Sequence, residues 1–327
     1  MTKNGMNILY FTGAGASCQV LPLVSDFVSR LRQFSGAIRH LASRTATGLA
    51  GPENLKEEEK ELLDAVEWLI PHAEKHASVD TFAKKLFFLN DLKELRKLKA
   101  VLSTFFVFEQ ARQNVDKRYD SFLASVLKID SKNELTIPEN LKILTWNYDT
   151  QWEKAFYGFC KDKTRVIDYI TFGNRLNRLN GYCGTFPDGK LGAAFFSMWE
   201  TDEDKALQHA IRLYKEYMTA GLPEPNIRFA WEDTTQTLFR KMQIDWQSIN
   251  ILIIIGYSFP YFNREVDRGI LKSLSNLQEV YLQYPEGIHD SIEERMLSSG
   301  LKFSSSSRRN NIIKITATDL FFIPDAL

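Results

Sequence analysis

The chain has 327 residues, of which 44% are hydrophobic and 25% are charged, proportions that exclude wholesale disorder and a coiled coil. The 41 Lys and Arg residues balance 41 Asp and Glu residues, which argues against a protein that covers nucleic acid with a broad basic surface. Cys18, Cys160 and Cys183 have no paired spacing, so neither a disulfide framework nor a zinc ribbon is expected. The purest apolar run, Ile251 to Ile255, is too short to span a membrane, and the first residues lack the pattern of a signal peptide. We therefore expect a cytoplasmic protein without a membrane segment.

The first predicted element is a short apolar strand, Asn7 to Phe11, which runs into Gly13-Ala14-Gly15-Ala16-Ser17. A run of this length stopped by glycines is typical of a strand buried on both faces of a parallel sheet. Ser25 or Asp26 is expected to cap a helix that carries apolar residues from Phe27 onward at helical spacing.

The composition changes over the next hundred residues, which contain few Gly and Pro residues and many Glu, Lys and Leu residues. Apolar residues recur three and four apart over residues 57–70 and 79–113, which predicts helices. We expect residues 37–137 to form a helical insertion beside a nucleotide-binding core made of residues 5–36 and 138–327, all within a single domain of residues 1–327.

Strand patterns return in the second half of the chain. After a strand at Leu141 to Trp146, Thr150 and Glu153 have the spacing of a capping box that opens a helix. Further strands are expected at residues 165–171, 178–182, 250–255, 279–283 and 312–316, and helices at 204–218, 234–242 and through 266–274. The alternation predicts an α/β fold with a doubly wound, Rossmann-like parallel sheet, whose ligands bind beyond the carboxyl ends of the strands.

Four polar or glycine-rich segments follow predicted strands. They are Gly13 to Ser17, Thr145-Trp146-Asn147-Tyr148-Asp149, Leu179-Asn180-Gly181 and Gly256-Tyr257-Ser258. Glycines after a strand let the backbone approach a diphosphate, which the next helix N-terminus favours. Each segment alone is explained equally well as a turn, and for Asp149 a helix-capping role is favoured over catalysis. Cys18 replaces the third glycine of the dinucleotide fingerprint, which argues against an ordinary dehydrogenase.

Taken together, these segments resemble the sirtuin family over nearly the whole chain. GAGAS with Leu21-Pro22 and Asp26-Phe27 is similar to the sirtuin opening that grips NAD, and TWNYD is similar to the family's Thr-x-Asn-x-Asp motif, whose asparagine lies in the nicotinamide pocket. Leu179 to Gly181 falls where the family carries Leu-His-Gly, and IIIGYS resembles its late nucleotide-binding segment. The resemblance implies that NAD contacts Gly13, Ala14, Gly15, Ala16, Ser17, Asp26, Thr145, Asn147, Gly181, Gly256, Tyr257 and Ser258.

Two departures separate this chain from the deacylating sirtuins. The two Cys-x-x-Cys pairs that hold zinc are missing, and Asn180 stands where the family has its catalytic histidine. An amide cannot accept a proton near neutral pH as imidazole can, so deacylation is not expected. A zinc-free sirtuin core enlarged by helices resembles the bacterial effectors that destroy NAD during phage infection. This resemblance implies an NAD glycohydrolase in which Asn147, Asn180 and Asp149 form the catalytic set.

Other interpretations remain open at this stage. The chain could be a degenerate sirtuin-like module that senses NAD or a derived nucleotide without chemistry, for which Asn180 is the best support. A subunit acting on polynucleotides is disfavoured by the neutral charge. His72 and His76 share a predicted helix face suited to a metal, although solvent exposure is the more common outcome for such pairs. An effector of this kind is expected to be silent until a homo-oligomer, an operon-encoded partner protein or a phage trigger activates it.

Overall fold

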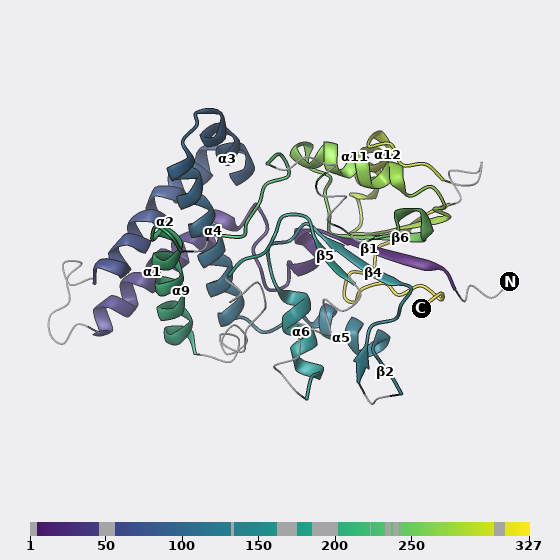
Figure 1. The fold of residues 1–327 in the computed structure, drawn as a ribbon, viewed down its shortest axis with the longest axis horizontal. Coiled ribbons are helices and arrows are strands. Elements are labelled where there is room, and N and C mark those ends of the chain that lie inside the picture. The colour runs from purple at the N-terminus through teal and green to yellow at the C-terminus, as the bar shows by residue number, and fades with distance from the viewer. Residues whose placement is uncertain are drawn as a thin grey trace.

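The computed structural model describes residues 5–45, 56–131, 134–161, 175–184, 202–222, 224–232, 237, 242, 244–303 and 311–327. Its centre is a six-stranded parallel sheet in the order β5-β4-β1-β6-β7-β8 (Figure 1). The strands are β1 (Asn7–Thr12), β4 (Leu141–Thr145), β5 (Leu176–Arg178), β6 (Ile249–Ile255), β7 (Glu279–Gln283) and β8 (Ile312–Ile315).

Counted along the chain, these six strands lie in the order 3-2-1-4-5-6, which is the order of dinucleotide-binding sheets. The sequence prediction of a doubly wound α/β fold is confirmed. The strand order reverses between β1 and β6, so the crevice where such sheets bind ligands lies beyond Thr12 and Ile255, which are paired in register.

The central strand β1 shows why the sequence folds this way. Ile8 and Tyr10 point into the apolar cluster on one face of the sheet, while Leu9 and Phe11 point into the cluster on the other. All four are completely buried, as expected for a strand with a helical layer on each side. One layer contains α11 (Arg264–Ser273) and α12 (His289–Ser298); α5 (Lys117–Val126) and α6 (Gln151–Phe159) lie on the opposite side of the sheet (Figure 1).

The remaining long helices form a block beside the sheet, on the left in Figure 1. They are α1 (Phe27–Thr45), α2 (Glu57–Lys75), α3 (Val79–Phe88), α4 (Leu92–Arg112) and α9 (Glu203–Met218). In this helical block α1 packs along α2, and α4 packs along α9. The block therefore includes a helix from far down the chain, and the boundary expected after residue 36 falls inside α1.

The structure corrects three details of the sequence prediction. The helix expected over residues 79–113 is broken, because Asn90 adopts a left-handed conformation (φ 55°) and the Asp91 side chain then caps α4 by accepting from the Glu94 N–H at 3.2 Å. A short antiparallel hairpin, β2 (Lys128–Ile129) and β3 (Leu135–Thr136), lies within the region expected to be helical. Helix α12 was not anticipated.

The capping box expected at Thr150 is also wrong. Thr150 directs its backbone N–H and its hydroxyl group to Gln110 Oε1 at 2.7 and 3.2 Å, while Glu153 is bound by Arg178. The strand expected at 165–171 lies outside the described residues, as does most of the helix expected at 234–242. Within the described part of the chain, no helix combines the length and the apolar character needed to cross a bilayer.

Candidate functional site

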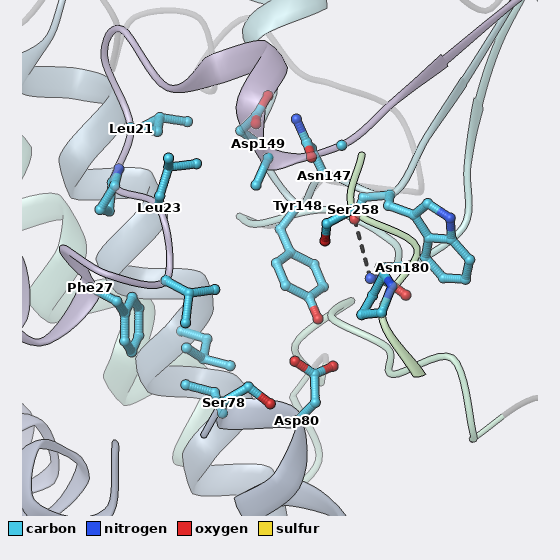
Figure 2. Close-up of a pocket in the computed structure, with 18 of the residues that line it drawn as sticks. Leu21, Leu23, Phe27, Ser78, Asp80, Asn147, Tyr148, Asp149, Asn180 and Ser258 are labelled. Atoms are coloured by element: carbon cyan, nitrogen blue, oxygen red, sulfur yellow. Dashed lines mark hydrogen bonds between the residues drawn. The ribbon is translucent and has the colours of Figure 1, made fainter. Parts of the chain in front are cut away.

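A cavity of about 360 Å³ lies at the strand-order reversal, between the carboxyl ends of β1, β4 and β6 and the helical block (Figure 2). This volume is in the range of small-molecule sites. From the sheet side it is lined by Gly13, Ala14, Ser17, Trp146, Asn147, Tyr148, Asp149, Asn180, Gly256, Tyr257 and Ser258. Three of the four predicted segments thus contribute two or more residues to one cavity, and the fourth contributes Asn180.

The glycine loops after β1 and β6 touch each other. The Gly13 N–H donates to Ile255 O at 3.1 Å, and the Gly15 N–H donates to Gly256 O at 2.9 Å. Gly256 has a left-handed backbone (φ +61°), and a Cβ there would lie 2.4 Å from the backbone nitrogen of Ala16. Glycine is therefore needed where these loops meet. Of the loop residues predicted to contact NAD, Gly13, Ala14 and Gly256 line the cavity, whereas Gly15 and Ala16 do not.

The side chain of Asn147 is oriented by a short hydrogen-bond network. Its Nδ2 donates to Ser17 Oγ at 3.3 Å, and Ser17 Oγ donates to Asp149 Oδ2 at 2.9 Å. The Tyr119 hydroxyl group also contacts Ser17 Oγ, at 2.8 Å. The backbone N–H of Asn147 donates to Thr145 Oγ1 at 3.1 Å. Thr145, which was predicted to contact NAD, therefore supports Asn147 and is not part of the cavity lining. The network holds the amide of Asn147 at the cavity wall, joining the loops after β1 and β4.

Asp149 has the helix-start role that the sequence favoured. Its Oδ1 accepts from the backbone N–H of Gln151, the first residue of α6, at 3.1 Å. Burial raises the pKa of Asp149, while the nearby Arg178 guanidinium opposes that rise. With both oxygens engaged and 6% of its surface exposed, Asp149 fixes Ser17 and Asn147 and also contributes to the cavity wall.

Two arginines, Arg118, which is buried, and Arg178, which is partly buried, support these loops, and the sequence did not point to either. Arg178, at the end of β5, donates to the carbonyl oxygens of Asn147 (3.2 Å) and Asp149 (2.6 Å) and binds both oxygens of Glu153. Arg118, in α5, donates to Ala16 O at 2.9 Å and pairs with Asp116 at 2.6 Å. The Arg118–Asp116 pair is buried and the Arg178–Glu153 pair is largely shielded, so each loop is fixed by a charge that would be costly to leave unpaired.

Asn180 lines the cavity and has an unused acceptor. Its Nδ2 donates to Trp146 O at 3.2 Å (Figure 2), whereas its Oδ1 is buried and accepts no hydrogen bond from any described residue. The side chain is 7% exposed, so a ligand donor is the natural partner for this oxygen. The neighbouring Gly181 lies outside the lining. Its φ is +75°, and a Cβ there would lie 1.8 Å from Asn226 O, so a glycine is needed for the close approach of these two backbone segments.

Tyr257 connects the cavity wall to a buried carboxyl group. Its hydroxyl group donates to both oxygens of Asp267, at 2.9 and 2.7 Å, and the indole Nε1 of Trp146 donates to the same carboxyl group at 3.2 Å. Burial raises the pKa of Asp267 from 3.8 to about 8. Trp146 and Tyr257 stack with ring centroids 5.9 Å apart, so the loops after β4 and β6 are held together behind the site.

The helical block supplies a wall that the sequence did not predict. Ser78, the N-cap of α3, and Asp80, in its first turn, line the cavity together with His76. His76 Nδ1 lies 2.7 Å from His72 O, and its Nε2 lies 2.8 Å from Lys85 Nζ. In the described part of the chain, no group of three or more His, Cys, Asp or Glu residues is arranged to hold a metal ion.

Two further residues lie away from the cavity lining. Asp26, predicted to contact NAD, is exposed, and its carboxylate accepts from the Ser25 hydroxyl group at 3.2 Å. Cys18 is also exposed, and Arg118 Nη2 donates to its sulfur at 3.7 Å.

No protein-family model and no curated protein matches this chain.

Proposed function

We propose that this protein is an NAD glycohydrolase that cleaves the nicotinamide–ribose bond and serves as a cytoplasmic anti-phage effector in bacteria by depleting NAD. The observation that carries the proposal is one cavity at the β1/β6 reversal of a 3-2-1-4-5-6 sheet, lined by Gly13, Asn147, Asn180 and Ser258. Dinucleotides bind such sheets at this reversal. The sirtuin-like motifs identified in the sequence agree with the same ligand.

Hydrolysis of the nicotinamide–ribose bond requires little acid–base catalysis from the protein. Nicotinamide leaves NAD as a neutral molecule and takes the bonding electron pair with it, while a water oxygen bonds to the ribose C1′ and releases one proton to solvent. The site must position the ribose, stabilise the developing positive charge and direct the water. Polar groups that are fixed beforehand and need not titrate are sufficient for these tasks.

Two asparagines suit this assignment. Asn147 is held by Ser17 through its Nδ2, which leaves Oδ1 to orient water or the carboxamide of nicotinamide. Asn180 has a buried free acceptor for a ribose hydroxyl group. Asp149 positions Asn147 through Ser17 and places its negative charge at the wall. The diphosphate would lie against Ala14 of the glycine loop, because no Lys or Arg is among the described residues of the lining and the N–H groups of Gly13 and Gly15 already donate to the end of β6 and the loop after it.

The test is nicotinamide release from NAD by the purified protein, with and without extract of infected cells to supply an activator or an oligomer-inducing partner. We expect Asn147→Ala to lower release at least about a hundredfold, the scale of losing a fixed polar group at a reaction centre. Asn276→Ala is the matched control, because Asn276 is exposed and donates to Gln247 O outside the cavity. Equal release by wild type and Asn147→Ala contradicts the assignment.

A second candidate is a sensor that binds NAD or a derived nucleotide without turnover. The observation that favours it is Asn180, an amide without base strength at the position facing the ligand. Saturable NAD binding that never yields nicotinamide, under every condition of the same assay, would establish the sensor and reject the hydrolase. Asn180→His then reports whether adding a base at this position creates turnover.

A further inference from the structure

Asp80 is a carboxyl group that faces the cavity from the helical block. It lies in the first turn of α3, is half-buried, and points toward the hydroxyl group of Tyr148 on the opposite wall (Figure 2). Among the described residues it has no ion pair and no hydrogen bond from another side chain. Burial raises the pKa of Asp80, and its own backbone N–H opposes that rise. A carboxylate placed in this way attracts a cation when one enters the cavity.

The cavity that Asp80 faces has a lining suited to an organic cation. The lining contains the aromatic rings of Phe27, Phe106, Tyr148 and Phe229, and among its described residues no Lys or Arg. Aromatic faces attract cations, more strongly where water is excluded. The Tyr148 hydroxyl group donates its hydrogen bond to Arg228 O, at 3.4 Å, and not to the carboxyl group of Asp80.

A helix-stabilising role is the simplest alternative for Asp80, because acidic residues are favoured in the first turn of a helix. That role does not require the side chain to be directed into a cavity. Asp120 provides the comparison, because it also lies in the first turn of a helix, α5, but is exposed and is not part of the cavity lining.

We propose that Asp80, together with Tyr148 and the other aromatic rings of the cavity lining, recognises the positively charged nicotinamide ring, so that the cavity selects the oxidised dinucleotide over its reduced form. This inference rests on the proposed function, since it assigns the nicotinamide end of NAD to the wall formed by α3. It makes Asp80 a specificity-determining residue supplied by the helical block, whereas Asn180 on the sheet side contacts the ribose.

Calorimetric binding of three nucleotides tests the proposal. The carbocyclic analogue of NAD keeps the cationic ring and resists hydrolysis, NADH has a neutral ring, and ADP-ribose has no ring. We expect the wild-type protein to bind the cationic analogue about tenfold more tightly than NADH, equivalent to about 1.4 kcal/mol. Asp80→Asn should reduce this ratio to near one and leave ADP-ribose affinity within about twofold. Asp80→Glu and the matched control Asp120→Asn should both keep the preference.

Each result bears on the proposal. An unchanged ratio in Asp80→Asn, or an equal loss of affinity for ADP-ribose, overturns the role of Asp80 and leaves NAD hydrolysis standing. Preference for the cationic analogue in a protein that releases no nicotinamide supports Asp80 and rejects hydrolysis. A wild-type protein that binds none of the three nucleotides overturns both.

Discussion

Asp267 is a buried carboxyl group that makes the stability of this fold depend on pH. Its pKa is raised by burial from 3.8 to about 8, although Tyr257 and Trp146 both donate to it and favour its charged form. In the unfolded chain the same group loses its proton near pH 4. Between these two pH values the folded state binds more protons, so Asp267 lowers the free energy of unfolding as the pH rises, by up to about 1.4 kcal/mol per pH unit.

We therefore expect Asp267→Asn to remove part of the loss of stability between about pH 5 and pH 8, because an amide does not ionise when buried. Urea unfolding at several pH values in this window measures the change. Asp120→Asn, which removes an exposed carboxyl group, should leave the pH dependence close to that of wild type. A slope in Asp267→Asn as steep as in wild type would show that another group governs the pH dependence.

At the scale of elements, the contact between the loops after β1 and β6 defines the floor of the cavity. We expect Gly256→Ala to weaken nucleotide binding and to lower the free energy of unfolding, because its Cβ would lie 2.4 Å from Ala16 N and force the loops apart. Gly287→Ala is the matched control, since Gly287 also has a left-handed backbone (φ +92°) but a Cβ there meets nothing within 4 Å.

Both substitutions carry the strain of a left-handed residue, about 1–2 kcal/mol. Gly256→Ala adds the cost of an overpacked contact, about 1–3 kcal/mol more. Urea unfolding and nucleotide titration of the two variants separate these effects. Equal stability and equal binding in the two variants would mean that the loop contact is not required.

The elements themselves were largely predictable because their signals are local. An apolar run stopped by glycine or polar residues gave β1, β4, β6 and β7 to within about one residue at each end, and helical spacing gave α9. The exceptions have local causes that composition does not reveal, such as the left-handed Asn90 that separates α3 from α4. The hairpin β2–β3 is too short to have a distinct pattern.

The candidate site was predictable only on its sheet side. Asn147, Asn180 and Ser258 follow strands, and parallel strands bring their carboxyl ends to one edge. Asp80, Arg118 and Arg178 reach the site or its supporting loops through contacts between distant segments. Such contacts leave no pattern in the local sequence. From the sequence alone, these residues therefore cannot be distinguished from ordinary charged residues on the surface.

For the molecule as a whole, the cavity joins the sheet to the helical block, with Asn147 and Ser258 on one side and Ser78 and Asp80 on the other. A ligand that contacts both walls stabilises the folded state and slows local opening of every element it touches. We expect the carbocyclic NAD analogue to increase protection from hydrogen exchange in residues 79–88 and in residues 256–260 over the same concentration range.

In the same experiment, ADP-ribose distinguishes protection of the sheet side of the cavity from protection of the helical block. Because it lacks the nicotinamide ring, it should protect residues 256–260 while leaving residues 79–88 close to their unliganded rates. The hairpin β2–β3 is the internal reference, since its described residues are absent from the lining. Protection by the NAD analogue that is confined to the loops of the sheet would show that the helical block serves the structure alone. Joint protection means that the block and the sheet form one binding unit, so any partner that displaces α3 would also change how the nicotinamide ring is held.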